Sequence, residues 1–565
     1  MTEIVATAEG ELTKVGADFP TAQIIKHMHG RIRVGIEVER LYQALTTVSD
    51  AGSHALAGLT AVDLAQVEPA TMGGSSSVKA APRLRVLYLL RAPPSRCVQL
   101  SADFDPAKTD LKSIIDLWPG ADWLEREVAE MFGVRFSGRA TPRPLLIQQR
   151  SAHHPLLKSY PLLGEPAADV DAENTGAESG PDTTSLITAL PTLRMRLRVV
   201  AGRVALGAPV PGFAHCGIEK LAESLTYMQA MVLCERLNEQ APQAGSLGLA
   251  LAVESALEIE VPPRGNYQRV VIAELSRLRG HLAWLSMQSE AAGAHMIWRE
   301  AMQLRAAVVE AMDRLRGVGS GTGLLAIGGQ AADFPPEFAD CTLALSRCVR
   351  TALARLRNQL TGNRLWRDLV DGMAPLSATE AAQWGLSGPV LRACGTAWDL
   401  RKQEPYLAYG DLDFDVPVGS HGDTLDRCAV RMDEMVESTG LIEQAIRQMP
   451  AGPWRSEDRR VFPTTESAQV GERVESMIRH MQLWTEGHGL RLPAGIEVYH
   501  PTESPNGELG VLLCADGTDR PYRLHLRSPS LLNFQVAGGL VADLPMAQAR
   551  QALCSLNIVP SEMDR

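Results

Sequence analysis

The sequence predicts two domains of different class. Residues 1–162 are expected to form an α+β domain, and residues 191–565 a mainly α helical-bundle domain with small β-sheets. A chain of 565 residues is too long for one hydrophobic core. Residues 163–190 are acidic, rich in small residues and free of aromatic side chains. Such a stretch buries too little apolar surface to offset its ordering entropy, so a flexible linker is expected there.

In the first domain, hydrophobic patterning alternates between helical and strand periods. Two runs rich in Val and Leu, separated by Ala92-Pro93-Pro94-Ser95, predict neighbouring strands. A Gly/Ser-rich run predicts a loop before them. The expected elements are a helix at 38–48, a loop at 72–77, strands at 84–90 and 97–104, and helices at 108–117 and 123–132.

The second domain opens with strand-like alternation over residues 192–210, after which a helical period dominates to about residue 450. Several of these patterns exceed the mean helix length, as is typical of a bundle with a buried middle. A strand meander is expected at 497–526, with Asp516-Gly517 as a turn. The expected helices are 218–238, 248–259, 267–288, 296–316, 337–359, 425–448 and 470–486.

Composition narrows the class of protein. The 45% hydrophobic and 21% charged content is ordinary for a globular protein. The sequence contains no apolar run of about 18 residues that would predict a membrane span. The N-terminus is acidic where a signal peptide is basic and apolar, so a cytoplasmic protein is expected. A net charge of −11 argues against nucleic acid as a partner. The nine cysteines occur singly, without C-x-x-C, and indicate free thiols.

The most informative segment is 123–136, WLEREVAEMFGVRF. On a helix, Glu127 and Glu130 lie one turn apart beside an apolar stripe, and a solvated charged face is one interpretation. Together with HPLLKSYPL at 154–162, the segment resembles the C subunit of bacterial NADH:quinone oxidoreductase, a domain that energy-converting hydrogenase large subunits also carry. Arg139 stands where that family usually has His or Lys.

Five segments of the second half resemble the D subunit of NADH:quinone oxidoreductase and the homologous large subunit of nickel–iron hydrogenases. Their order and spacing extend from about residue 190 to the last residue. The resemblance implies a fused C/D-type subunit with a hydrogenase large-subunit-like fold. The segments lie within 215–223, 261–282, 388–402, 506–523 and 563–565.

The resemblance also shows where metal ligands would lie in a hydrogenase. Its two C-x-x-C pairs correspond here to Asn238 and Ala241, and to Val559 and Glu562. Soft thiolates are needed to bind nickel and iron in such a centre. We therefore expect no metal ligands in this chain, which excludes a hydrogenase catalytic subunit.

The quinone-site pattern implied by the D subunit is altered as well. Gly180-Pro181 lacks the His of a G-P-x-H-P loop, Glu239 stands in place of a Tyr, and Ala291 in place of an Asp. A carboxylate does not replace a neutral phenol donor toward a quinone oxygen. The segment 317–321 lacks a His, and Cys216 replaces the Arg of an H-R-G motif. Loss of a cation beside a partner's cluster should lower its reduction potential.

Six residues remain as candidates by resemblance. The predicted catalytic residues are His215, Glu239 and His281, and the predicted cofactor-binding residues are Cys216, Glu219 and Arg236. Glu239, if buried, would be a proton carrier with a raised pKa. Simpler interpretations compete with these. Glu219 and Glu223 form an i, i+4 pair that is usually solvated.

The cysteines and paired histidines also have ordinary structural interpretations. Cys216 and Cys234 lie too far apart to share a metal on one straight helix and are expected to be buried small apolar residues. Cys341 and Cys348 are expected along one apolar stripe, and His153-His154 in a structural loop. Metal binding by His27 and His29 is a minor alternative.

The resemblance implies a peripheral protein on the inner face of the cell membrane, with three kinds of partner. These are an iron–sulfur small subunit, a ferredoxin-like subunit and antiporter-like integral membrane subunits. No cofactor is expected on the chain itself; an iron–sulfur cluster would lie in a partner, and quinone could bind nearby. Two alternatives stay open: a quinone reductase that uses different residues, and a structural subunit without redox function.

Overall fold

The computed structural model describes residues 23–26, 32–50, 55–65, 83–92, 95–140, 143–147, 153–164, 183–187, 193–315, 323–461, 473–485 and 489–565. The expected loop at 72–77, His27, His29 and most of the acidic linker lie outside these residues. Within them, no helix combines the length and apolarity that crossing a bilayer requires. The chain divides into two compact units. The N-terminal unit is Met1–Pro181 with Pro211–Leu221 and Thr379–Leu386, and the C-terminal unit is the remainder.

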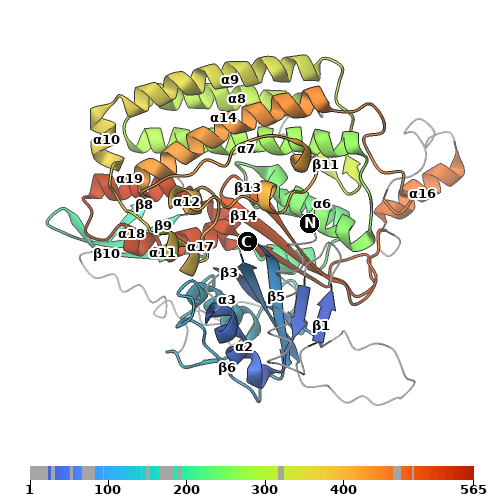
Figure 1. The fold of residues 1–565 in the computed structure, drawn as a ribbon. Helices are drawn as coiled ribbons and strands as arrows, with labels where there is room; N and C mark the ends of the chain where they lie inside the picture. Colours follow the sequence, from blue (N-terminus) through green and yellow to red (C-terminus); the bar gives the residue numbers. More distant parts are fainter. Residues whose placement is uncertain are drawn as a thin grey trace, which may run out of the picture. The chain divides into compact units, whose positions relative to one another are not determined.

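The N-terminal unit is built on a five-stranded sheet of order β1-β2-β5-β4-β3, in which only β2 and β5 are parallel (Figure 1). Helix α3 packs on β3 and α2 on β5. The strands are β1 (Gln23–Lys26), β2 (Ile32–Gly35), β3 (Ala55–Asp63), β4 (Leu84–Ala92) and β5 (Ser95–Phe104). The helices are α2 (Val38–Asp50) and α3 (Ala121–Phe132).

The predicted elements at 38–48, 84–90, 97–104 and 123–132 are confirmed, but the predicted helix at 108–117 is wrong. That segment holds the short strand β6 (Leu111–Lys112), which pairs with β7 (Phe136–Ser137). The amides of Leu111 and Ser113 donate to the carbonyls of Arg135 and Ser137. Tertiary hydrogen bonds thus replace the helical ones. The sequence also did not predict β3, whose two faces are both buried, so it lacks strand alternation.

Two later segments complete the N-terminal unit. The amide of Gly120 donates to the carbonyl of Gln383 at 3.3 Å, and Arg91 Nη1 donates to the carbonyl of Leu386 at 3.2 Å. Gly212 has a φ of 100°, and a β-carbon there would lie 2.2 Å from the carbonyl oxygen of Leu146. Chain from beyond the predicted linker therefore belongs to the core of this unit.

The C-terminal unit is centred on four long helices that pack on one another, α7, α8, α9 and α14 (Figure 1). Helix α7 is buried on nearly every side, because α8, α14, α6 and α19 all pack against it. Their bounds are α6 (Pro242–Leu257), α7 (Pro263–Ala291), α8 (His295–Arg314), α9 (Phe338–Thr361), α14 (Thr424–Gln448) and α19 (Met546–Leu556).

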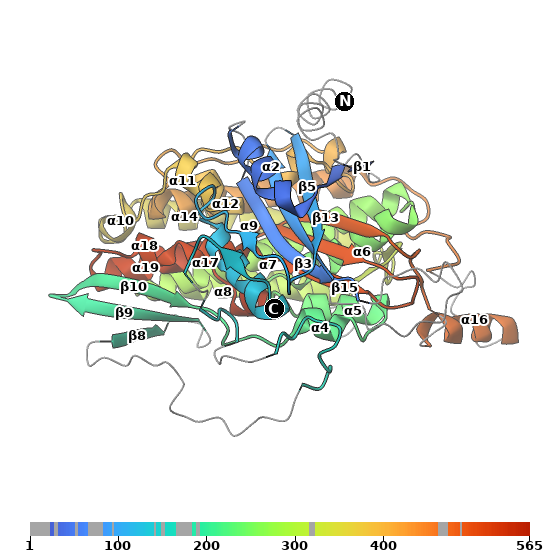
Figure 2. The same cartoon turned by 90° about the horizontal axis from the view of Figure 1, so that it is seen from below.

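Small sheets and short helices surround these long helices. The antiparallel sheet β13-β14-β15 lies against α6, and a second sheet has the order β10-β9-β8 (Figure 2). The strands are β8 (Thr183–Ile187), β9 (Arg194–Val200), β10 (Arg203–Val210), β11 (Leu325–Ala326), β12 (Gly329–Gln330), β13 (Glu497–Ser504), β14 (Gly507–Cys514) and β15 (Arg523–Arg527). The other helices of the described residues are α5 (Tyr227–Glu235), α10 (Arg364–Val370), α12 (Gly388–Ala393), α13 (Leu400–Gln403), the 3₁₀ turn η3 (Tyr409–Asp411), α16 (Val474–Trp484), α17 (Pro529–Gln535), α18 (Ala537–Leu540) and α20 (Pro560–Asp564), together with α4 (Ile218–Ala222) and α11 (Ala378–Gln383), which belong mainly to the N-terminal unit.

One predicted helix, 218–238, is broken into α4 and α5. The break is fixed by a capping box at Thr226: its hydroxyl accepts from the amide of Gln229, and the Gln229 side chain accepts from the amide of Thr226. Reciprocal capping satisfies the first amides of a new helix, so α4 does not continue into α5. The other predicted helices and the meander at 497–526 are confirmed, apart from shifts at their ends.

Candidate functional site

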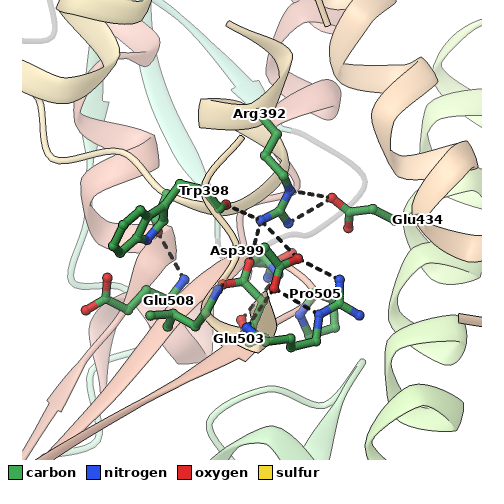
Figure 3. A network of polar contacts seen from close by, with 12 residues as sticks. Arg392, Trp398, Asp399, Glu434, Glu503, Pro505 and Glu508 are labelled. Carbon is green, nitrogen blue, oxygen red and sulfur yellow. Dashed lines mark hydrogen bonds and ion pairs between the residues drawn. The ribbon is translucent and has the colours of Figure 1, made fainter. Parts of the chain in front are cut away.

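The interior of the C-terminal unit contains a buried network of arginines and carboxylates (Figure 3). Its members come from α7, α12, α13 with its N-cap, α14 and β13, and each is at most 5% exposed. We call this set the arginine–carboxylate network. It comprises Glu274, Arg277, Arg392, Asp399, Arg401, Arg431, Glu434 and Glu503.

Arg392 joins the helices to the sheet. Its guanidinium contacts a Glu434 carboxylate oxygen at 2.8 Å and a Glu503 carboxylate oxygen at 2.8 Å, and it donates to the carbonyl of Trp398 at 2.8 Å (Figure 3). Asp399 lies 3.6 Å away. One side chain on α12 therefore ties α14 and β13 to the loop before α13.

Glu274, on the buried helix α7, is the second centre of the network. Its two oxygens receive Arg401 Nη1 at 3.1 Å and Arg277 Nε at 3.3 Å. The hydroxyls of Tyr409 and Ser438 donate to the same carboxylate at 2.6 and 2.7 Å. Burial alone would raise the pKa of Glu274, but these arginines and hydroxyls hold that pKa below its ordinary value.

His281 closes the network at the α14 side, with Nε2 3.0 Å from a carboxylate oxygen of Glu434. Burial lowers the pKa of His281 to about 4, although Glu434 opposes that shift. The ring is therefore neutral at pH 7 and donates its Nε2 proton to Glu434. Burial would raise the pKa of Glu434, but Arg392 and His281 bring that pKa well below its usual range.

The charges of the network are balanced. With Arg431, which faces both His281 and Glu434, four guanidinium groups meet four carboxylates. A neutral His281 leaves the set with no net charge, which suits a dry interior. Glu503 is the one carboxylate of the four whose pKa lies above its ordinary value, because burial raises that pKa more than Arg392 lowers it.

A second polar group adjoins the network at the C-terminus. Glu562 accepts hydrogen bonds from the hydroxyl of Ser530 and from Asn506 Nδ2, the latter at 3.2 Å. Asn238 lies close enough to lower the pKa of the same carboxyl, and Asn557 Nδ2 donates to Asn506 Oδ1 at 2.6 Å. We call these five residues the Glu562 cluster. Burial raises the pKa of Glu562 more than Ser530, Asn506 and Asn238 together lower it.

Arg431 connects the two groups. Its Nη1 donates to the carbonyl of Pro505, next to Asn506, at 3.2 Å. Its Nη2 donates to the carbonyl of Leu556, next to Asn557, at 3.1 Å. Burial lowers the pKa of Arg431 to about 10, so the guanidinium stays charged at pH 7. Network and cluster form one continuous buried polar site.

The Glu562 cluster lies where the resemblance to hydrogenases placed metal ligands. The slots at Asn238 and Glu562, 324 residues apart in the sequence, are brought close together by the fold. Ala241 and Val559, in the other two slots, are fully buried apolar residues. One amide and one carboxylate do not provide the thiolates that a nickel centre requires, so the donor set does not fit that metal.

The six sequence-predicted site residues do not converge in one described place. His215, Cys216 and Glu219 belong to the N-terminal unit, whereas Arg236, Glu239 and His281 belong to the C-terminal unit. His281 alone lies in the buried polar site. Arg236 and Glu239 are exposed, so the burial on which a proton-carrying Glu239 depended is not met.

Other expectations need correction. Cys216 is exposed rather than buried, whereas Cys234 is buried as expected. Glu219 is 5% exposed, which excludes a solvated face for it. Cys341 and Cys348 are both exposed and thus do not lie on the apolar side of α9.

The acidic signature of α3 has a structural role. Glu125 accepts from the hydroxyl of Ser113, the amide of Ile114 and Arg139 Nη1, all within 2.9 Å for the nearer oxygen. Glu130 accepts from three successive amides, Leu145 to Ile147. The solvated-face interpretation is therefore wrong: these acids fix the loops around the helix. His154 Nδ1 contacts the carbonyl of Glu130 at 2.8 Å, which supports its structural interpretation.

Sequence reasoning missed Glu434, Glu503, Asn506 and Ser530. A signal existed for Glu434, because α14 repeats charged residues at 427, 431 and 434 along the side that also carries buried apolar residues. Charges on the apolar side of a helix indicate a buried network. No comparable pattern marks Asn506 or Ser530, which lie in a turn and at a helix start.

Two family models match the chain. Residues 34–166 match the respiratory-chain NADH dehydrogenase 30 kDa subunit, and residues 292–565 match the 49 kDa subunit. The order of the two units, with their α+β and helical classes, is thus that of two respiratory subunits joined in one polypeptide.

Curated relatives agree. The NADH-quinone oxidoreductase C/D subunit of Bdellovibrio bacteriovorus is 34% identical over 468 residues, which is 80% of this chain and 82% of the relative. The D subunit of Wolbachia pipientis from Culex pipiens is 36% identical over 375 residues, 66% of this chain and 95% of the relative. The D subunit of Rickettsia bellii is 37% identical over the same length. The chain belongs to the C/D-subunit family of NADH-quinone oxidoreductase.

Proposed function

We propose that this chain is a non-metal-binding subunit that positions a partner's iron–sulfur cluster and supports electron transfer toward quinone or ion translocation. It would act on the cytoplasmic side of the membrane, with an iron–sulfur small subunit, a ferredoxin-like subunit and antiporter-like membrane subunits as neighbours. The observation that carries the proposal is the Glu562 cluster. At the place where a hydrogenase would hold its metal, this family member has a buried carboxyl among amide and hydroxyl donors.

The geometry supports a role in holding rather than in metal chemistry. Buried charge pairs cost desolvation energy and fix one arrangement of their elements when all partners are present. The arginine–carboxylate network gives α7, α12, α14 and β13 such an arrangement beside the Glu562 cluster. A rigid scaffold of this kind suits a subunit that sets the distance between a neighbour's cluster and its electron acceptor.

Under this proposal, the predicted site residues hold the scaffold together or face partner subunits. His281 holds Glu434 and thereby Arg392. The exposed Arg236, Glu239 and Cys216 would face partner subunits. His215 and Glu219 would line the N-terminal unit's contribution to the same assembly.

The test is to purify the complex with its native membrane partners and to measure metal content, the EPR spectrum after reduction, and quinone-dependent NADH oxidation. We expect iron at cluster stoichiometry, no nickel, and a cluster signal assigned to a partner. Nickel bound at stoichiometry with this chain would contradict the proposal.

The alternative is a structural subunit without redox function, which the altered quinone-site positions favour. The variant Glu562→Gln distinguishes the two. We expect it to assemble normally and to lower quinone-dependent activity at least about tenfold, a change that corresponds to about 1.4 kcal/mol. Exposed Glu310→Gln is the matched control. An assembled complex without quinone-dependent electron flow in the wild type would favour the structural alternative.

A further inference from the structure

Helix α16 has a row of apolar side chains on its exposed side. Val474, Met477, Ile478 and Met481 are 68%, 50%, 49% and 60% exposed. Their spacing of three, one and three residues places them on one face of a helix. Isolated exposed apolar residues are common, but four large ones in one row mark an interaction surface.

Among the side chains of α16 that are described, the buried one is polar and the exposed ones include a row of apolar residues. Ser476, on the side away from the row, is 6% exposed, whereas the four apolar residues of the row are about half exposed or more. In the longer helix α8 of the same unit, Ile297, Leu304 and Val308 are buried. In Figures 1 and 2, α16 lies at the edge of the C-terminal unit, away from α7, α8, α9 and α14. Folding of this chain alone does not cover the row.

Charge decides which kind of surface would cover it. Residues 472–486 contain Glu472, Glu475 and Glu486 against Arg473 and Arg479, with no lysine, which gives a net charge of −1 with histidine neutral. Helices that lie on a membrane surface are rich in Lys and Arg, because lipid head groups are anionic. A segment with a slight negative charge does not complement such a surface, whereas a protein groove with a basic rim does.

We propose that the exposed face of α16 is a docking surface for another subunit of the same complex, one that offers an apolar groove with a basic side chain opposite Glu475. The chain belongs to a family of subunits, so neighbouring subunits exist to cover it. Glu475 is exposed, and its position on the helix places it at the rim of the row, next to Val474 and Ile478. Two methionines suit such a contact, since their flexible side chains adapt to a partner's shape.

A photocross-linking amino acid at position 477 tests the proposal in the complex as it is assembled in its native membrane. We expect an adduct that contains a peptide of another subunit, identified by mass spectrometry. The matched control is position 365, because Leu365 on α10 is 78% exposed but stands alone. It should give no such adduct. A phospholipid adduct, a cross-link within this chain, or no adduct at position 477 would overturn the proposal.

A second measurement uses the triple variant Met477→Ser, Ile478→Ser and Met481→Ser, with Leu365→Ser as its control. Because all four side chains are exposed, the circular dichroism spectrum and thermal midpoint of the purified chain should not change. We expect the triple variant to be recovered in the complex at least ten times less than the wild type, and the control at the wild-type level. Incorporation of the triple variant at the wild-type level would refute the docking role. Neither readout depends on quinone reduction, so a failure of the proposed function would not affect them.

Discussion

Arg392 shows how a single side chain organises the interior of the C-terminal unit. It is fully buried and contacts carboxylates from α14 and β13. Arg392 is the largest of the groups that hold the pKa of Glu434 well below its usual range despite burial, ahead of His281. Removing the cation would leave Glu434, Glu503 and Asp399 with too little positive charge in a medium that solvates charge poorly.

We therefore expect Arg392→Met to lower the free energy of unfolding by about 3–5 kcal/mol, because a buried pair that loses one partner leaves an uncompensated charge. Urea denaturation of the purified chain would measure this change. Arg367→Met is the matched control, since Arg367 pairs with Asp371 at the surface and should have little effect. Equal losses in the two variants would contradict the assignment.

His281 makes stability depend on pH. Its folded-state pKa, about 4, lies below its unfolded value of about 6.5, so the unfolded chain binds more protons between these values. Stability should therefore fall as the pH is lowered from about 6.5 to 4, by up to about 1.4 kcal/mol per unit. Unfolding measured at pH 7, 6 and 5 gives this slope.

The variant His281→Gln keeps a donor toward Glu434 but does not titrate, so most of the slope should disappear. The exposed His421→Gln should retain it, because His421 is 79% exposed. A slope unchanged in His281→Gln would assign the pH dependence to other groups.

At the scale of elements, the start of α12 and the β13–β14 turn require two glycines to meet. Gly388 has a φ of 66°, and a β-carbon there would lie 2.4 Å from the Cα of Gly507. The hydroxyl of Ser387 accepts a hydrogen bond from the amide of Glu508 at 3.1 Å, which links the start of α12 to β14. This approach brings Arg392 on α12 within reach of Glu503 on β13.

We expect Gly388→Ala to destabilise the chain by more than about 1 kcal/mol, because both its backbone conformation and the contact with Gly507 disfavour a β-carbon. Thermal unfolding of the purified protein would report it. Gly539→Ala is the control: that glycine is in helix α18 with open space around its Cα, so its replacement should be neutral or slightly stabilising. A Gly388→Ala protein as stable as the wild type would mean that the turn can separate from α12.

At the scale of the whole molecule, the N-terminal unit is assembled from three parts of the chain. Segments 211–221 and 379–386 come from beyond the acidic linker, yet they pack in the same unit as residues 83–162. The D subunit occurs as a separate polypeptide in relatives such as that of Wolbachia pipientis. We therefore expect the contacts at Gln383 and Leu386, rather than covalent continuity through the linker, to hold these segments in the unit.

A protease site inserted between residues 170 and 175 tests this. After cleavage, we expect the two fragments to elute together in size-exclusion chromatography, because the later segments remain packed in the N-terminal unit. The same variant without protease treatment is the control. Separation of the fragments at low salt would show that the linker is needed for association.

The sequence predicted the elements whose pattern is local and missed those that depend on neighbours. The helices at 267–288 and 425–448 follow from a repeated apolar period and are confirmed as α7 and α14. The predicted helix at 108–117 failed, because the amides of Leu111 and Ser113 find partners in β7. Of the six predicted site residues, His281 lies in the buried polar site, while Glu239 and Arg236 are exposed.

The sequence by itself determined the family and the order of its two parts, because these are properties of residue identity and spacing. Only the tertiary structure decided that Asn238 and Glu562 meet, that Arg392 binds Glu434 and Glu503, and that the apolar row of α16 faces outward. The physical reason is that burial and ion pairing join residues far apart in the chain. Local periodicity carries no record of which distant groups will compensate one another's charge.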